Sequence, residues 1–384
     1  MSVAFRLITG ALCFVTASGP GVAEPCRTDV PKSAVGLGDF VSWERNFQPG
    51  HARNVPVENA RYVRVLFQQR DQSDAAWTLR IRDGDGRPIQ SITSTAVGAA
   101  PFWTRRLYAD TIKIEVDSKS PTSPVQSLFY QVMPENPVPF YSTKSATPDW
   151  SDVYNHADGA RGPVEEFEKR QAEAVGMFIT AEGNNLDGVA TWTCSGALVV
   201  DRPGLLFLTN DHCGGLSEPR WSSSVCQGNG IVDFSWDGDA ISRQHQCLEV
   251  VKRSSSLDLA LLRLAPAASD DAAPLPASFA MNIDEGEAIA VIHHPSSETK
   301  KISRNCVALI ADVSGTVNEA NDFAYDCDTE AGSSGAPVFD AEGNVVGIHH
   351  TGHEKAAAGQ CDGLNKAVRL DRIREFLREA GVDP

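Results

Sequence analysis

The sequence lacks the features that mark several large classes of protein. None of its nine cysteines forms a C-x-x-C pair, so the common zinc spacings are missing. No stretch beyond the N-terminus is long and apolar enough to span a bilayer. Basic residues are in deficit, and the formal net charge of −16 argues against nucleic acid and anionic membranes as partners. Internal repeats and low-complexity tracts are absent, which leaves a soluble globular protein as the expectation.

The N-terminus has the pattern of a secretory signal. Residues 1–23 carry one charge, Arg6, followed by an apolar run, and they end in the small residues that precede a cleavage site at Ala23. The alternative is a short membrane anchor, but the run is too short to span and has no stop-transfer pattern. We therefore expect cleavage near Ala23 and a secreted or periplasmic protein.

An even number of cysteines would remain after this cleavage. Cys13 leaves with the signal, and the eight others then predict disulfides in an oxidising compartment. Four bridges allow 105 connectivities, so the count does not decide the pairing.

Residues 24–145 are expected to form a small β-sandwich. Several short segments alternate apolar and polar residues or are rich in β-branched and aromatic ones, and turn signals such as Asp83–Gly86 separate them. The expected strands are Arg61–Gln68, Trp77–Arg82, Thr111–Val116 and Leu128–Met133.

A polar segment, residues 146–172, is expected to link this sandwich to a second domain. A short helix is expected to open at Pro163. Residues 173–384 again show strand patterns, and the chain ends in an amphipathic helix that Asp371 could cap and Gly381 could end. The expected strands here are Gly176–Thr180, Thr191–Val200, Leu205–Thr209, Leu257–Leu264, Ala288–Ile292 and Val345–His349.

Three motifs in this second domain carry residues suited to nucleophilic catalysis. Ser334 lies in Thr329–Phe339 (TEAGSSGAPVF), where glycines allow the backbone to turn, although the G-x-S-x-G elbow is not satisfied because Ala336 replaces its last glycine. His212 follows a strand in Phe207–Gly215 (FLTNDHCGG). Asp258 stands in an apolar run, where a buried acid needs a partner such as a histidine N–H. Each motif alone also suits a purely structural role.

Taken in the order His, Asp, Ser, these motifs resemble the trypsin/chymotrypsin-like serine peptidase superfamily. The likeness covers roughly residues 173–384 and is nearest to bacterial lysyl endopeptidase-type and glutamyl endopeptidase-type enzymes. Trp192–Val199, His293–Ser296 with Lys300–Ser303, and Cys327–Pro337 resemble the lysyl type. Val346–His349 and the closing helix also resemble the glutamyl type. Pro101–Thr104 and the rest of the N-terminal region resemble a β-rich segment that precedes some bacterial proteases of this kind.

The resemblance implies an all-β fold, a chymotrypsin-like double β-barrel with a C-terminal helix, preceded by the small sandwich. It implies a serine endopeptidase with protein or peptide substrates and no cofactor. His212 would be the base, Asp258 would fix its tautomer, and Ser334 would form the acyl-enzyme. The backbone N–H groups of Gly332 and Ser334 would bind the oxyanion.

One position departs from the pattern of animal trypsins. Those enzymes carry an aspartate just before the nucleophile, which pairs with a newly cut N-terminus. Ser333 occupies that position here, and no I-V-G-G-like start occurs. The ion-pair switch of zymogens is therefore not expected.

The resemblance also suggests four disulfides: Cys194–Cys213, Cys306–Cys327, Cys226–Cys247 and, by elimination, Cys26–Cys361. A metal site is not expected, because the spacing of His349, His350, His353 and Cys361 matches no zinc pattern.

Two residues predict opposite substrate preferences. Asp328, six residues before Ser334, would lie at the base of the substrate pocket and select Lys or Arg. His349 lies where glutamyl endopeptidases place a histidine that meets a substrate carboxylate. The wider likeness to lysyl enzymes favours Lys or Arg, and cleavage after Glu or Asp is the alternative. A non-catalytic protease-like binding protein and an esterase are the rival functions.

Overall fold

The computed structural model describes residues 39–134 apart from 56, 58–59, 71–75, 98–100, 105–106 and 108. It further describes residues 141–142, 149–153, 164–181, 191–200, 204–215, 220–235, 243–266, 276–309, 321–352, 356–357, 360–361 and 364–383. The expected signal, residues 1–23, lies outside these ranges. No helix in the described part of the chain is long and apolar enough to cross a membrane.

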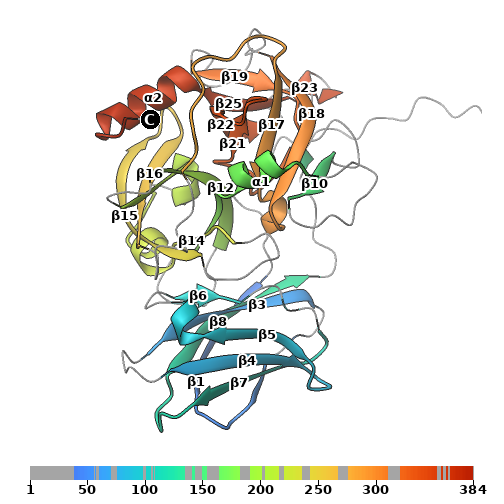
Figure 1. Cartoon of the computed structure of the whole chain (residues 1–384), viewed down its shortest axis with the longest axis vertical. Coiled ribbons are helices and arrows are strands. Elements are labelled where there is room, and N and C mark those ends of the chain that lie inside the picture. The colour runs from blue at the N-terminus through green and yellow to red at the C-terminus, as the bar shows by residue number, and fades with distance from the viewer. Residues whose placement is uncertain are drawn as a thin grey trace, which may run out of the picture.

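The N-terminal domain is a sandwich of two antiparallel sheets (Figure 1). One sheet has the order β1(Asp39–Phe47), β8(Val125–Pro134), β3(Ala60–Gln69), β6(Phe102–Trp103). The other has the order β2(Arg53–Val55), β7(Ile112–Ser118), β4(Trp77–Asp83), β5(Pro88–Thr93). Alternating residues such as Leu79 and Ile81 point inward, which places an aromatic and aliphatic core between the sheets. A 3-10 turn, η1(Ser94–Ala96), follows β5.

The first barrel of the second domain is closed by six strands. Their order is β11(Val175–Ala181), β12(Thr191–Val200), β13(Leu205–Thr209), β16(Leu259–Leu264), β15(Gln244–Ser254), β14(Ile231–Asp233). The run Leu205–Thr209 is buried along its whole length because one face points into the barrel and the other toward the second barrel. Two short helical turns, η2(Asp211–Gly214) and η3(Ser224–Gly228), connect these strands.

A second ring of six strands forms the other barrel. Its order is β17(Ala288–His293), β21(Pro337–Phe339), β22(Val345–Gly352), β25(Asn365–Arg369), β19(Asp322–Tyr325), β18(Lys301–Leu309), and pairing of β18 with β19 closes it. The turn η5(Pro295–Ser297) follows β17. Two further short pairs are β9(Tyr141–Ser142) with β20(Thr329–Glu330), and β23(Ala356–Ala357) with β24(Gln360–Cys361). The expected all-β class and double barrel are confirmed.

Parts of the expected linker pack on the second barrel. β10(Trp150–Asp152) pairs with β18, and α1(Glu166–Ala172) lies against the barrel surface (Figure 1). A capping box between Glu165 and Glu168 starts α1. These segments therefore belong structurally to the protease-like half of the chain.

The closing helix, α2(Leu370–Glu379), packs with one face on the seam between the barrels. Its N-cap is Arg369, so the expected cap at Asp371 is wrong. Asp371 lies inside the first turn, where its charge favours the helix N-terminus and pairs with Arg369. Gly381 adopts a φ of 78° just beyond the helix, the left-handed conformation that ends many helices.

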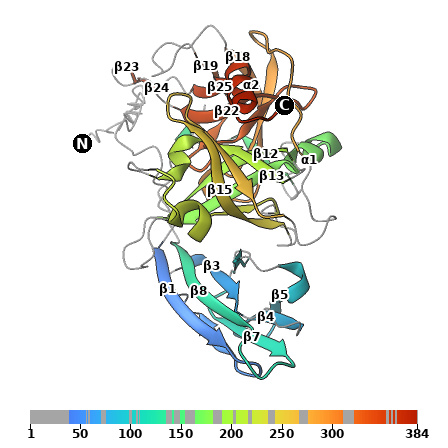
Figure 2. The same cartoon turned by 90° about the vertical axis from the view of Figure 1, so that its left-hand side faces the viewer.

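The sandwich lies next to the first barrel (Figure 2), and a small cluster of apolar side chains joins the two. Trp103 and Leu66 pack against Met177, Ile179 and Ile231. The Gln244 side chain adds a reciprocal pair of hydrogen bonds: it accepts from the Trp103 N–H at 2.7 Å and donates to the Trp103 carbonyl at 3.1 Å. The sandwich is thus docked on the barrel by both apolar and polar contacts.

We predict that Gln244→Ala destabilises this docking by about 1–3 kcal/mol, because two hydrogen bonds are lost and the Trp103 backbone is left unsatisfied. Gln246→Ala on the same strand is the control, since its side chain donates to Gln227 at an exposed site. Chemical denaturation of both variants measures the effect. Equal losses of stability in the two would contradict the prediction.

Candidate active site

His212 is held where the first barrel faces the second. Strand β13 ends at Thr209, and η2 then carries His212 on a buried turn. The Cys194–Cys213 disulfide ties this turn to β12. The indole N–H of Trp192 donates to the Cys213 carbonyl at 2.7 Å. The disulfide and this hydrogen bond therefore fix the backbone that carries the His212 imidazole.

Asp258 contacts His212 twice from the turn between β15 and β16. Its Oδ2 lies 2.7 Å from His212 Nδ1, and its Oδ1 accepts the His212 backbone N–H at 2.9 Å. Asn210 Nδ2 donates to the Asp258 carbonyl, which supports the positive φ of 52° at this residue. Burial alone would raise the pKa of the Asp258 carboxyl, but His212 and His350 hold that pKa well below its usual range. Asp258 is thus ionised and fixes the His212 tautomer with a proton on Nδ1.

A second histidine, His350, lies behind Asp258. The sequence had drawn attention to His350 only as part of a rejected metal cluster and had not predicted a role for it beside Asp258. Its Nδ1 is 3.4 Å from Asp258 Oδ2 and its Nε2 is 3.1 Å from Asp322 Oδ2. Burial opposes its protonation, but the two carboxylates raise the pKa of His350 to about 9. No local pattern could have indicated this, because Asp258 and Asp322 are both distant in sequence.

The Ser334 loop is fitted closely to the first barrel. The Ser195 N–H donates to the Ser334 carbonyl at 2.7 Å, and Gly335 donates to the His349 carbonyl at 2.8 Å. Gly335 has a φ of 85°, and a Cβ there would lie 2.2 Å from the Ser195 carbonyl oxygen. Only glycine fits, which explains the Ser334-Gly335 pair and places the loop beside Thr209, three residues before His212.

The two backbone N–H groups that are expected to bind the oxyanion have no acceptor among the described residues. In the described part of the chain, neither the Gly332 N–H nor the Ser334 N–H makes a hydrogen bond. Nε2 of His212 likewise has no partner among the described residues. The arrangement leaves two amide donors and one imidazole acceptor available to a ligand.

The two expected pocket residues are buried in different surroundings. Asp328 Oδ2 accepts the Asp149 N–H at 2.6 Å, so the linker segment reaches the expected pocket base. His349 Nδ1 lies 2.6 Å from the Tyr325 hydroxyl. Burial raises the pKa of Tyr325, so the hydroxyl keeps a proton that it can donate to His349 Nδ1. Burial, followed by neighbouring histidines, lowers the pKa of His349 well below its usual value.

Among the residues that the structure describes, three disulfides are present: Cys194–Cys213, Cys226–Cys247 and Cys306–Cys327. The expected Cys26–Cys361 pair stays a prediction, because Cys26 lies outside the described residues. The sulfurs of Cys194 and Cys213 approach His212 closely enough to suggest a metal site, but as a disulfide they offer no thiolate ligand.

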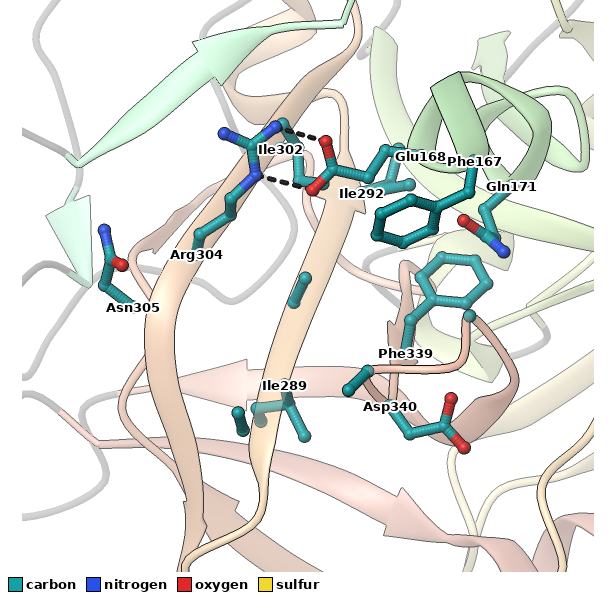
Figure 3. Close-up of a pocket in the computed structure, with 14 residues that line it drawn as sticks. Phe167, Glu168, Gln171, Ile289, Ile292, Ile302, Arg304, Asn305, Phe339 and Asp340 are labelled. Atoms are coloured by element: carbon teal, nitrogen blue, oxygen red, sulfur yellow. Dashed lines mark hydrogen bonds and ion pairs between the residues drawn. The ribbon is translucent and has the colours of Figure 1, made fainter. Parts of the chain in front are cut away.

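A separate pocket of about 250 Å³ lies between α1 and the second barrel (Figure 3). Its floor is apolar, and Arg304 and Glu168 form an ion pair at its edge, as Figure 3 shows. None of its lining residues belongs to the His212, Asp258 and Ser334 set.

Two β-barrels that bring a paired His and Asp together with a Ser loop define a protein of the trypsin/chymotrypsin class. Comparison with known proteins agrees. Residues 194–348 match the family described as trypsin-like peptidase domain, so this part of the chain is a trypsin-like peptidase domain.

Two kinds of relative are informative. A glutamyl endopeptidase of Staphylococcus epidermidis is 27% identical over 210 residues, which cover 53% of this chain and 65% of the relative. The serine endoprotease DegS of Haemophilus influenzae is 26% identical over 124 residues, or 32% of this chain and 36% of the relative. The chain thus spans 65% of the length of the glutamyl endopeptidase it matches.

The contacts of His350 predict a pH-dependent contribution to stability. Its pKa of about 9 exceeds the ordinary value of 6.5, so protonation favours the folded state. The contribution should be complete below pH 6.5, at most about 3 kcal/mol, and should fade as the pH rises through 9. Denaturation of the wild type and His350→Gln at pH 6 to 10 measures it. A stability gap that stays constant over this range would refute the assignment.

Proposed function

We propose that the protein is an exported serine endopeptidase. The Ser334 hydroxyl attacks the scissile carbonyl while His212 Nε2 accepts its proton, and the Gly332 and Ser334 amides stabilise the resulting oxyanion. His212 then donates the proton to the leaving amine. Water resolves the acyl-enzyme by the same steps, with His212 again acting as base. Asp258 keeps the imidazole oriented throughout.

One observation carries this proposal. Asp258 fixes His212 through Nδ1 at 2.7 Å, while His212 Nε2 and the two loop amides have no partners among the described residues. A single unpartnered histidine nitrogen also occurs at the buried His245, so the telling feature is its combination here with an ionised aspartate on Nδ1 and two unpartnered loop amides. Unsatisfied groups that surround a serine are what an acyl-transfer site requires.

We also propose the domain organisation that the sequence indicates: a signal at 1–23, an accessory sandwich at 24–145, a linker at 146–172 and the protease at 173–384. Three disulfides suit an oxidising compartment outside the cytoplasm. Proteins or peptides are the substrates, and no cofactor takes part.

Ser334→Ala should abolish peptide hydrolysis and reaction with a serine-reactive phosphonate, because the nucleophile is gone. Loss of a triad member typically lowers turnover by ~10⁴–10⁶. Ser91→Ala, at an exposed position of the sandwich, is the control and should keep full activity. Phosphonate labelling followed by mass spectrometry reads out both.

Labelling of the Ser334→Ala variant would place the nucleophile elsewhere. A wild type that is neither labelled nor active would favour the rival function, a protease-like binding protein. Hydrolysis of small esters without hydrolysis of peptides would favour an esterase.

For specificity we propose cleavage after Glu or Asp, although the sequence alone favoured Lys or Arg. The Asp328 carboxylate accepts a hydrogen bond from the chain's own Asp149, whereas His349, when its Nδ1 accepts the Tyr325 hydroxyl, carries a proton on Nε2 that it can donate to a substrate carboxylate. The relatives named glutamyl endopeptidase support the same reading. Cleavage after Lys or Arg remains the second candidate because Asp328 is an acid at the expected pocket base.

The wild type should therefore cleave a peptide with Glu before the scissile bond at least tenfold better than its Lys counterpart, about 1.4 kcal/mol. His349→Phe should remove this preference, and Asp328→Asn should retain it. The ratio of kcat/KM for the two peptides is the measurement. Preferred cleavage after Lys that Asp328→Asn abolishes would reverse the proposal.

A further inference from the structure

The nucleophile loop lacks the aspartate that orders the same loop in animal trypsins, so something else must orient its amides. The decisive peptide joins Ala331 to Gly332. The Ala331 carbonyl accepts the Ser296 N–H at 2.7 Å. In a trans peptide the C=O and the following N–H point in opposite directions. The hydrogen bond from Ser296 therefore turns the Gly332 N–H away from η5 and leaves it without an acceptor in the described structure.

The next peptide of the loop is held from the same side. The Gly332 carbonyl accepts the Ser195 hydroxyl at 2.9 Å, and the Ser195 hydroxyl in turn accepts the His294 N–H at 2.9 Å. Gly332 has a φ of 95°, and a Cβ on it would lie 2.8 Å from the His294 carbonyl oxygen. The loop and the His293–Ser297 turn are thus in contact along two successive peptides.

Ser333, which replaces the aspartate, is bound by His293. Its Oγ accepts the Glu330 N–H at 3.1 Å and lies 2.7 Å from His293 Nδ1. On the other side of the ring, His293 Nε2 lies 3.5 Å from Ser303 Oγ, and that hydroxyl donates to the Asp328 carbonyl at 2.6 Å. This chain of contacts begins at the Glu330 N–H and ends at the Asp328 carbonyl. Both are backbone groups of the segment that leads into the nucleophile loop.

The proton directions in this chain are consistent. Ser333 Oγ already accepts from Glu330, so its hydroxyl is free to donate to His293 Nδ1, and the ring proton then lies on Nε2. Burial, followed by the charge of Lys301, lowers the pKa of His293 to about 3. His293 is therefore neutral at working pH, and Ser333 needs no charged partner.

The described groups around His293 agree with this role. Its ring is fully buried, and Trp150 of β10 packs edge-on against it at 5.4 Å. Lys301 forms an ion pair with Asp152, which like Trp150 belongs to β10. The Asp328 backbone carbonyl accepts the Ser303 hydroxyl.

We propose that the His293–Ser297 turn orients the oxyanion-binding amide of Gly332 and, through the Ser333 side chain, fixes the residue that precedes Ser334, with His293 and Ser195 as positioning residues. The contacts are neutral hydrogen bonds made by the chain itself, in place of an ion pair with a cut N-terminus. The oxyanion site is therefore formed before any cleavage in the linker. This inference rests on the proposed peptidase activity.

The test compares His293→Ala, Ser333→Ala and Ser195→Ala with wild type in the full chain. Each should lower kcat at least tenfold and change KM less than threefold, because amide donors to an oxyanion act mainly on the transition state; direct removal of one costs about 10²–10³. Affinity for a peptide aldehyde, whose adduct carries the oxyanion, should fall in parallel. Affinity for the product peptide should not.

Two further variants separate positioning from general damage. His293→Asn retains an acceptor for Ser333 and should recover part of the lost kcat. His245→Ala removes another buried histidine, bonded to the Ala265 carbonyl in the first barrel, and should leave kcat within twofold of wild type. Thermal unfolding checks that every variant is folded.

The outcomes are distinguishable. A wild type without activity or phosphonate labelling would remove the proposed function, and the inference with it. An active wild type whose His293, Ser333 and Ser195 variants lose no more kcat than His245→Ala would overturn the inference alone. The inference also fails if KM and product affinity change as much as kcat.

Discussion

The three candidate catalytic side chains come from two barrels, so their geometry depends on the apolar seam that joins those barrels. Leu208 and Leu261 of the first barrel pack with Ile292 and Ile348 of the second. His212 follows β13 and Asp258 precedes β16, the strands that carry these leucines, while Ser334 precedes β21 beside the two isoleucine strands. A close-packed seam transmits small displacements, so a change in its volume would move the imidazole relative to the hydroxyl.

Around this seam the buried charged side chains have partners that are distant in sequence. Asp258 is ionised between His212 and His350, and Asp322 completes the arrangement behind them. The loop on the other side relies on neutral groups instead, since His293 and Ser333 carry no charge. The site thus combines a charged base-orienting half with an uncharged half that binds the oxyanion.

The sequence predicted those features of the fold and site that depend on contiguous residues. The motifs around His212, Asp258 and Ser334 are local, and alternation such as that of Trp77–Arg82 is a property of a single strand. It did not predict roles that depend on distant partners. His350 and His293 could be recognised only once Asp322 and Ser333 were placed beside them. The sequence predicted Asp328 as a substrate selector, and nothing local indicated that Asp149, far away in sequence, donates to its carboxylate. The Asp371 cap failed because the helix starts two residues earlier than the pattern suggested, with Arg369 as its N-cap.

The short strand β10 covers a part of the protease half that would be exposed if that half were isolated without the linker. Trp150, Ser151 and Asp152 cover an edge of β18 with backbone pairing, and Val153 fills part of the seam. A chain that began at residue 173 would present that edge unpaired beside an uncovered apolar surface. Such an edge is a template for a strand from another molecule. The segment that joins the domains therefore also keeps neighbouring copies from adding themselves to the sheet, which links the solubility of the protease half to residues outside it.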